Sequence, residues 1–568
     1  MLSIGRFARR AARIIIPFTA LLLLQLLFTN YYGHSSDHVG SSQFGITEEV
    51  GLITSPITKT IPESTEPKNS NKDAKEGAGK NLPTSTTKGE NASEATVNIY
   101  RYHAAGSVGK ADADKQEAIR KMIRHAWSGY KKYAWGADEL NPETKDSYNW
   151  TQGSSMLFTP IDSMGTLYIS GLISEFKDAK ELVLQHLDFA AVKSDVNVFE
   201  TVIRVLGGLI STYDLDGDDR ILKKAIDLGN RLSHVFNTPN GIPNNIASLS
   251  TERSEPGQIS LATAGSIQLE HQYLTDVSGD ANYANKALFA LEQICSIKTR
   301  ISGLGPKLLS TSELVETSSE YGIGANTDSY YEYLLKLWIS TGDDRYRDLY
   351  DNAIAAIEEH LLVQTPDGHA YVPDKTTISE SRFHHLSCFS GGMIATGAAT
   401  KPSQHSDRLM KIAAQITRTC YDSYQIRPRQ LGGEWTGVDQ EGQLYIQSQV
   451  YRLRPETVES IFYMWRYTHD PIYREWGWNI VQALEKHCRD EVGYHGLEES
   501  NGIYNRQESF FLAETLKYLF LLFSDDDTIG LDKYVFNTEA HPISIRGHGR
   551  RHDSGAWVPI PAQGTFKS

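Results

Sequence analysis

The sequence predicts an all-α protein in which seven helical hairpins close into a toroid, preceded by a membrane anchor and a disordered stem. Three observations support this prediction. After about residue 114 the chain reads as helix after helix, with almost no alternating strand pattern. Similar helix joints recur at a regular interval, which indicates a repeat architecture. The first 112 residues differ from the rest in composition, so we expect them to lie outside the toroid.

The N-terminus predicts a signal anchor. Four arginines precede an apolar run over residues 14–28, which would span about 22 Å as a helix. The run is short for a membrane span and would suit a cleaved signal peptide, which is the alternative. No small-residue cleavage pattern follows it, however, and thin early-secretory membranes accept short spans. We therefore expect residues 1–13 to be a cytoplasmic tail, residues 14–28 a retained transmembrane anchor and the rest to be lumenal.

Residues 29–112 are rich in Ser, Thr, Gly, Lys, Glu and Pro and lack hydrophobic periodicity. Such a segment buries too little apolar surface to fold, so we expect a disordered lumenal stem. Residues 543–568 are expected to form a flexible tail. Asn91 and Asn149 stand in glycosylation sequons, which have meaning only in a lumenal protein.

Charge and cysteine content limit the classes of function that the chain can have. The net charge of −14 and the pI of about 5.7 argue against a nucleic-acid partner. Aromatic residues make up 10% of the chain, which is compatible with a carbohydrate-lined cleft. The four cysteines leave three full disulfide pairings open, and they show no zinc-ligand spacing.

The helix joints share a small polar cluster between two apolar helices. Five of them are centred 62 to 64 residues apart on Asp218, Asp280, Asp343, Asp407 and Asp470. Two looser joints, at Asp178 and Asp526, would complete seven hairpins. The first helix of each pair is the more apolar, so we expect it to line the inside. We prefer a closed toroid to an open solenoid because no polar capping repeat is evident at either end.

Acidic residues recur near the start of these inner helices, 12 to 18 residues before the joints. They are Asp162, Glu200, Asp328, Glu456, Glu508 and Glu514. In a toroid these helix starts share one rim, so the acids would form a ring. Acids also favour helix N-termini for electrostatic reasons alone. A ring of them instead favours carbohydrate chemistry, because two carboxylates across a cleft are the usual catalytic groups of glycoside hydrolysis.

Several longer motifs resemble glycoside hydrolase family 47, the class I α-1,2-mannosidases. They are HAWSGYKKYAWGADELNP, FETVIRVLGGL, GANTDSYYEYLLKLW, HHLSCFSGG, LRPETVESIFY, ESFFLAETLKYLFLLF and VFNTEAHP. The resemblance implies an (α/α)7 barrel over residues 113–542. It also implies calcium-dependent, inverting removal of terminal α-1,2-linked mannose from high-mannose N-glycans. We accordingly expect a monomeric catalytic domain in a type II membrane protein of the ER or Golgi.

The resemblance also implies roles for individual residues. The catalytic carboxylates would be Glu200, Asp328 and Glu456, with Glu200 as the general acid and Glu456 as the base. Thr538 would hold Ca²⁺. The substrate and the metal-bound water would contact Arg204, Glu270, His385, Arg454, Glu459, Phe510, Glu514 and Glu539. Cys388 and Cys420 would form the structural disulfide, leaving Cys295 and Cys488 unpaired.

The expected pKa shifts suit Glu456 as the base better than they suit Glu200 as the acid. A helix N-terminus and Arg454 should both lower the pKa of Glu456, as a base requires. Arg204, four residues after Glu200, should lower the pKa of that carboxyl too, although a proton donor needs a raised pKa. Glu200 and Asp328 therefore compete for the role of acid.

Two departures from the family pattern bear on specificity. Gly165 replaces a second acid after Asp162, and Asn326 replaces an arginine found in some members two residues before Asp328. We expect broader trimming than removal of a single mannose. The main alternative function is a lectin-like quality-control protein that binds glycans with little cleavage. A scaffold solenoid would explain the repeat but not the acids.

Overall fold

The structure is a computed structural model that describes residues 109–152, 154–373 and 381–545. Within these residues the chain is mostly helical, and none of the helices is both long and apolar enough to cross a membrane. The predicted cytoplasmic tail and anchor, nearly all of the stem with its Asn91 sequon, and the tail from residue 546 lie outside the described residues.

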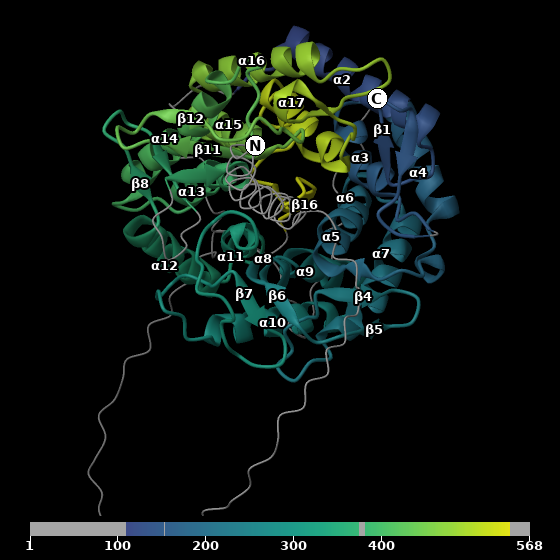
Figure 1. Ribbon diagram of the computed structural model, residues 1–568. Coiled ribbons are helices and arrows are strands. Elements are labelled where there is room, and N and C mark those ends of the chain that lie inside the picture. Colours follow the sequence, from purple (N-terminus) through teal and green to yellow (C-terminus); the bar gives the residue numbers. More distant parts are fainter. Residues whose placement is uncertain (1–108, 153, 374–380, 546–568) are drawn as a thin grey trace, which may run out of the picture. The chain divides into compact units, whose positions relative to one another are not determined.

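Seven helices form an inner ring by their mutual contacts, and Figure 1 shows how they are arranged. They are α3 (Phe158–Ile169), α6 (Gly207–Asp216), α9 (Gln268–Ser278), α11 (Asp328–Thr341), α13 (Ser390–Thr400), α15 (Glu456–Thr468) and α17 (Leu516–Leu522). Each contacts the next in this order. The ring closes because the π-helical turn η6 (Phe511–Thr515), which leads into α17, contacts α3. Every residue of α13 is buried, and its small side chains let neighbouring helices approach closely.

Seven further helices form the outer layer. They are α2 (Ala113–Tyr133), α4 (Ile173–His186), α7 (Asp219–Leu232), α10 (Asn282–Ser296), α12 (Asp344–His360), α14 (Ser406–Gln425) and α16 (Pro471–His487). Each packs mainly on one inner helix, and α7, α14 and α16 also contact the next inner helix of the ring. In α7 the buried residues Ile221, Ala225, Leu228 and Leu232 form a single stripe, as expected for a helix with one face on the core.

Four of the short joints, those after α6, α9, α11 and α15, share one local pattern. A residue in the left-handed conformation ends the inner helix, and Gly217, Gly279 and Gly342 fill this position with φ of 74°, 78° and 71°. An aspartate then caps the outer helix, as Asp218 and Asp343 do by accepting a backbone N–H. This pattern of a left-handed glycine followed by a capping aspartate explains the recurrent Gly-Asp pairs in the sequence.

The predictions of the two looser joints were wrong in detail. Asp178 lies inside α4, and the true joint is at residues 170–172. Asp526 follows α17 but is not followed by an outer helix; instead α17 packs on α2 from the beginning of the described chain. The seventh pair therefore joins the two ends of the domain, because only α2 remains to cover the last inner helix.

The sequence reading also missed short strands in the long loops between hairpins. They are β1 (Glu139–Asn141), β2 (Asp146–Tyr148), β3 (Val196–Asn197), β4 (Ile246–Ser248), β5 (Arg253–Ser254), β6 (Gln258–Ser260), β7 (Leu308–Ser310), β8 (Val363–Gln364), β9 (Ala370–Tyr371), β10 (Arg382–His384), β11 (Trp435–Val438), β12 (Leu444–Ile446), β13 (Gly496–Leu497) and β14 (Ile503–Tyr504). They pair antiparallel in small sheets, the largest of which have the orders β10-β11-β12 and β3-β4-β5. Two to four residues are too few for a visible alternation of polar and apolar side chains.

Single helical turns complete the loops: η1 (Phe189–Ala191), α5 (Val198–Glu200), η2 (Thr201–Leu206), η3 (Ser233–Phe236), α8 (Leu261–Gly265), η4 (His385–Phe389) and η5 (Glu499–Asn501). These loops precede the inner helices and lie at the end of the ring where those helices begin, which we call the acid rim. The opposite end, with the short joints, is the joint rim.

A last hairpin enters the ring. β15 (Tyr534–Phe536) and β16 (Pro542–Ser544) pair antiparallel, contact α11 and α6 respectively, and lie near the centre of the ring in Figure 1. β16 extends two residues past the predicted end of the catalytic domain. Residues 537–541, which we call the hairpin tip, include Thr538 and Glu539.

Candidate active site

Glu200 and Arg204 form the first part of the site. Asn197 caps the short helix α5, so Glu200 stands at its C-terminal end, and the π-helical turn η2 follows at once. Arg204 Nε donates to Glu200 Oε2 at 2.7 Å, while Arg204 Nη1 donates to Glu539 Oε1 at 2.6 Å. Arg204 thus links an inner helix to the hairpin tip.

Aromatic rings flank the same arginine. The guanidinium of Arg204 lies 5.6 Å from the ring centre of Trp150 and 5.5 Å from that of Phe510. The Trp150 side chain is 38% exposed, and Phe510 is partly buried. An arginine between aromatic faces is a suitable surface for a sugar ring, because it offers apolar contact beside hydrogen-bond donors.

π-helical turns follow two of the site residues. η2 begins immediately after Glu200, and η6 begins immediately after Phe510 and contains Glu514. Each π turn inserts one extra residue, which changes the direction of the side chains around it, and such turns occur frequently at functional sites.

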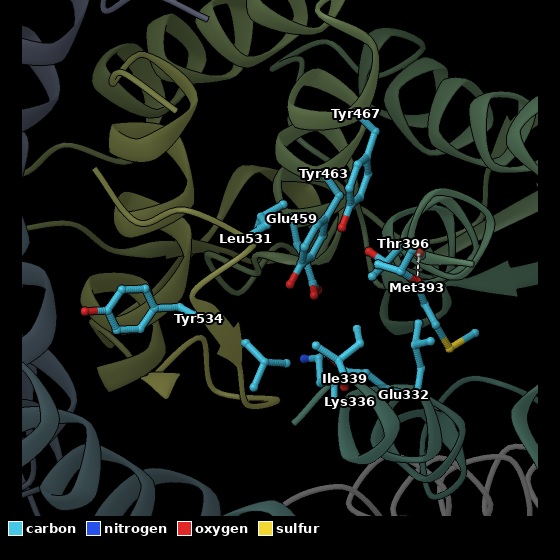
Figure 2. A pocket seen from close by; sticks show the side chains of 13 residues that line it. Glu332, Lys336, Ile339, Met393, Thr396, Glu459, Tyr463, Tyr467, Leu531 and Tyr534 are labelled. Atoms are coloured by element: carbon cyan, nitrogen blue, oxygen red, sulfur yellow. Dashed lines mark hydrogen bonds and ion pairs between the residues drawn. The ribbon is translucent and has the colours of Figure 1, made fainter. Parts of the chain in front are cut away.

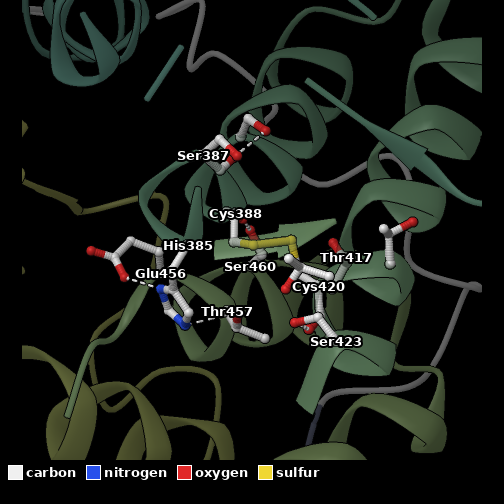
Figure 3. Close-up of a disulfide and its surroundings, with 12 residues drawn as sticks. His385, Ser387, Cys388, Thr417, Cys420, Ser423, Glu456, Thr457 and Ser460 are labelled. Carbon is white, nitrogen blue, oxygen red and sulfur yellow. Dashed lines mark hydrogen bonds and ion pairs between the residues drawn. A yellow bond between two sulfur atoms is a disulfide. The ribbon is translucent and has the colours of Figure 1, made fainter. Parts of the chain in front are cut away.

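Glu456 begins α15, as the sequence predicted, and is held by His385 (Figure 3). His385 Nδ1 lies 2.7 Å from Glu456 Oε2, and its Nε2 lies 2.7 Å from the Tyr424 hydroxyl. Burial raises the pKa of Glu456, but the hydrogen bond and charge of His385 and the charge of Arg454 outweigh it, so the net pKa is lowered. Glu456 is therefore an ionised carboxylate.

A disulfide supports this part of the site. Cys388 lies three residues after His385 in η4 and is bonded to Cys420 of α14, which confirms the predicted pair. Among the described residues, Cys295 and Cys488 are free, also as predicted.

Arg454 precedes Glu456 but makes its strongest contacts elsewhere. Its Nε and Nη2 donate to the two carboxylate oxygens of Glu434 at 2.7 and 2.8 Å. This bidentate pair fixes the orientation of the arginine at the acid rim.

Asp328 begins α11, and its pKa is shifted in the opposite direction from that of Glu456. Burial raises its pKa to about 7, and the negative charges of Glu332 and Glu456 add to the increase. The backbone N–H of Ser329 donates to its Oδ1 at 2.9 Å. The effect of Glu456 on this pKa shows that the two carboxyl groups, from separate inner helices, lie within electrostatic range of each other.

The hairpin tip carries Thr538 and Glu539 to the same region. The Thr538 N–H donates to the Tyr333 hydroxyl at 3.4 Å, and this hydroxyl in turn donates to Glu270 Oε1 at 2.6 Å. Burial raises the pKa of Glu270 to about 7, and its Oε2 has no hydrogen-bond partner among the described residues.

Three predicted acids, one of them in the tip itself, share a buried and strongly negative environment. Burial raises the pKa of Glu459, Glu514 and Glu539 well above the ordinary value, and the repulsion of neighbouring carboxylates increases it further. Glu514 feels the charges of Glu539, Glu456 and Glu459 together. All the predicted site residues are thus linked by contacts or mutual electrostatic effects.

A pocket lies beside this acid cluster, between α11, α13, α15 and β15. Figure 2 shows Lys336 and Glu459 reaching toward its centre, with Tyr463 and Tyr467 alongside. Glu332 and Lys336, four residues apart on α11, form a buried ion pair at its wall.

Sequence reasoning missed several residues of the site. They are Glu332, Lys336, Tyr424, Glu434, Lys517 and Asn537. A lysine within an otherwise apolar inner helix, as at Lys336 and Lys517, was an available signal, because buried lysines need partners. Glu434 and Asn537 lie in loops, where no periodicity marks a residue.

A closed ring of helices with buried carboxylates, arginines and aromatic rings at one rim is an arrangement suited to a glycoside hydrolase. Residues 122–545 match glycosyl hydrolase family 47, and the chain belongs to this family. It is 41% identical over 451 residues to human mannosyl-oligosaccharide 1,2-alpha-mannosidase IC, covering 76% of this chain and 70% of that protein.

Two other comparisons agree with this assignment. The chain is 38% identical to the endoplasmic reticulum mannosyl-oligosaccharide 1,2-alpha-mannosidase of Rattus norvegicus over 461 residues, covering 76% of this chain and 68% of that protein. The structure matches that of the alpha-1,2-mannosidase from Trichoderma reesei with a TM-score of 0.73 and 26% identity, over 77% of this chain and 100% of that one.

Proposed function

We propose that this glycoside hydrolase is a calcium-dependent, inverting α-1,2-mannosidase that removes terminal mannose from high-mannose N-glycans. The family and the names of the relatives support the substrate class. The observation that carries the proposal is that the pKa values of two carboxyl groups within electrostatic range of each other are shifted in opposite directions. Glu456 has a lowered pKa, and that of Asp328 is raised to about 7. Such a pair can divide the roles of base and acid.

Glu456 is proposed to remove a proton from the attacking water. His385 holds its carboxylate at Oε2, and Tyr424 holds the far side of the imidazole. In an inverting enzyme the two carboxyl groups stand far enough apart for a water between the base and the sugar. Inversion thus requires Glu456 to act on water and not on the anomeric carbon.

Two carboxyl groups compete for the role of proton donor. Asp328 keeps its proton up to about pH 7, whereas the carboxylate of Glu200 is engaged in an ion pair with Arg204 at 2.7 Å. The electrostatics therefore favour Asp328. Glu200 could donate only through a water, or after the substrate displaces Arg204.

The residues around the hairpin tip fit a hard cation. Glu270 has a buried oxygen without a partner among the described residues, and the neighbouring acids repel one another. The hydroxyl and carbonyl oxygens of Thr538 would hold Ca²⁺, which prefers oxygen ligands. Within the described residues no group of three or more His, Cys, Asp or Glu side chains could hold a metal ion, so waters and sugar hydroxyls would complete the ligands. Bound there, Ca²⁺ would orient sugar hydroxyls and lower the pKa of a water.

The closed circuit of inner-helix contacts supports an (α/α)7 barrel as the architecture. Arg204, Arg454 and Phe510 at the acid rim would contact the sugar. Asn326, which is exposed beside Asp328, leaves room at the mouth and supports trimming of more than one mannose. A type II membrane protein of the ER or Golgi remains our proposal. Its support is the arginine-flanked apolar run and the relative named for the endoplasmic reticulum.

The decisive experiment uses the full-length chain with a Man₉ N-glycan. In calcium we expect release of free mannose, with β-mannose as the first anomer detected by proton NMR. A chelator should abolish the release. Tight glycan binding without release of mannose would instead indicate the lectin-like alternative, and α-mannose as the first product would contradict inversion.

A further inference from the structure

The hairpin tip is fixed by a single side chain that bonds both within the tip and outside it. Asn537 is completely buried and uses its full hydrogen-bonding capacity. Its Oδ1 accepts the N–H groups of Glu539 at 3.0 Å and His541 at 2.8 Å. Its Nδ2 donates to the Ile203 carbonyl and to Glu270 Oε1, both at 2.9 Å.

The inner wall is shaped to receive this amide. A Cβ atom added at Gly207 would lie 2.5 Å from Asn537 Nδ2, so a side chain there would push the amide away. Gly207 begins α6, directly after the π-helical turn that carries Arg204. Asn537 therefore ties the tip to the π-helical turn η2 through Ile203 and to the inner helix α9 through Glu270.

Two buried lysines hold the same tip from other helices. Lys336 of α11 donates to the Asn537 carbonyl at 3.3 Å, and Lys517 of α17 donates to the Ala540 carbonyl at 2.6 Å. Their exposures are 6% and 0%. Thr538 and Glu539 thus lie between two carbonyls anchored by charged donors. A charge-assisted hydrogen bond to a backbone carbonyl restrains the chain more strongly than a neutral one.

We propose that Asn537, assisted by Lys336 and Lys517, is a positioning residue that sets where Thr538 presents its oxygens and so sets the affinity for calcium. This inference rests on the proposed function. A serine at position 537 could still accept an N–H within the tip but would be too short to reach Ile203 and Glu270. The variant N537S therefore cuts the tether and preserves the local turn.

The test measures the melting temperature of the full-length chain against calcium concentration after chelation. In N537S we expect the half-saturating calcium concentration to rise about 10–100-fold, the usual effect of removing a group that orients a metal ligand. The matched control is N244S, because Asn244 is also buried, at 2% exposed, and its amide donates to Ser254 and not to the tip. The control should lower the melting temperature in chelator and leave the half-saturation unchanged.

The variant K517M separates the effect of positioning the tip from the effect of removing a charge. It also provides the test if N537S does not fold. Loss of a positive charge near the acids should by itself tighten calcium binding, whereas loss of the bond to Ala540 should weaken it. We expect weaker binding, by about tenfold. Unchanged or tighter binding in K517M, or an unchanged half-saturation in folded N537S, overturns the inference. A wild-type chain without any calcium-dependent shift would overturn the proposed calcium site itself.

Discussion

The two rims of the ring differ in which residues adopt the left-handed backbone conformation. At the joint rim, glycines take up the left-handed conformation, at Gly217, Gly279 and Gly342. His469 is the exception there. At the acid rim, where glycines such as Gly303 and Gly442 also take positive φ, and at the hairpin tip, several residues with side chains adopt it too. They include Leu157 (57°), Asn326 (78°), Leu453 (62°) and Ala540 (54°).

These residues stand next to the site. Asn326 precedes Asp328 by two residues, and Leu453 precedes Glu456 by three. The Thr515 hydroxyl donates to the Leu453 carbonyl at 2.6 Å, so contacts from a distant helix hold the strained residue in place. A left-handed conformation costs a residue with a side chain about 1–2 kcal/mol. The joint rim is therefore built for stability, and the acid rim carries strain that its tertiary contacts maintain.

The largest expected effect is at the acid rim. Glu456→Gln should lower kcat by about 10²–10⁴-fold, because a neutral amide cannot accept the proton of the attacking water. The melting temperature should stay close to that of the wild type, since the amide can still bond to His385. Initial rates on a Man₉ glycan, together with thermal unfolding, check both expectations. Residual activity near the wild-type level would show that the base is misassigned.

A second prediction concerns the proton donor. Asp328 has a raised pKa, so it holds its proton below about pH 7 and loses it as the pH rises through that value. We expect kcat/KM to fall about tenfold per pH unit above this point. A plateau should extend below it until Glu456 is protonated.

A substrate with a good leaving group identifies which residue is responsible for the fall in kcat/KM above pH 7. Asp328→Asn should lose activity on the glycan but keep most of it on α-mannosyl fluoride, whose leaving group needs no proton. Glu200→Gln is the matched variant. If Glu200→Gln shows this pattern and Asp328→Asn does not, Glu200 is the donor.

The smallest effect belongs to the joint rim. Gly217→Ala should lower the free energy of unfolding by about 1–2 kcal/mol, because alanine is strained at a φ of 74°. An added Cβ meets no atom within 4 Å, so the loss comes from the backbone alone. Urea unfolding measures it. The value of kcat should not change, and a clear decrease would mean that the two rims are mechanically coupled.

The rims also differ in how well the sequence predicted them. The joints at Asp218 and Asp343 were placed correctly because a glycine and a capping aspartate act within a few residues. The joints at Asp178 and Asp526 were misplaced because the first lacks the aspartate cap and the second has no following helix. The acids at helix starts were found by counting from the joints. Glu434, Lys517 and Asn537 were missed because their partners lie in other structural elements, which no local pattern brings together.

The sequence alone determined the helical hairpins, the cysteine pair expected from the family motifs, and the identity of the acids, since helix periodicity, capping and motifs are local properties. Only the tertiary structure decided that α2 covers α17 and that the hairpin tip enters the ring among the acids. It also gave Asp328 and Glu456 opposite pKa shifts, because burial, the effect of the charge of His385 on Glu456 and that of Glu456 on Asp328 depend on how separate elements pack.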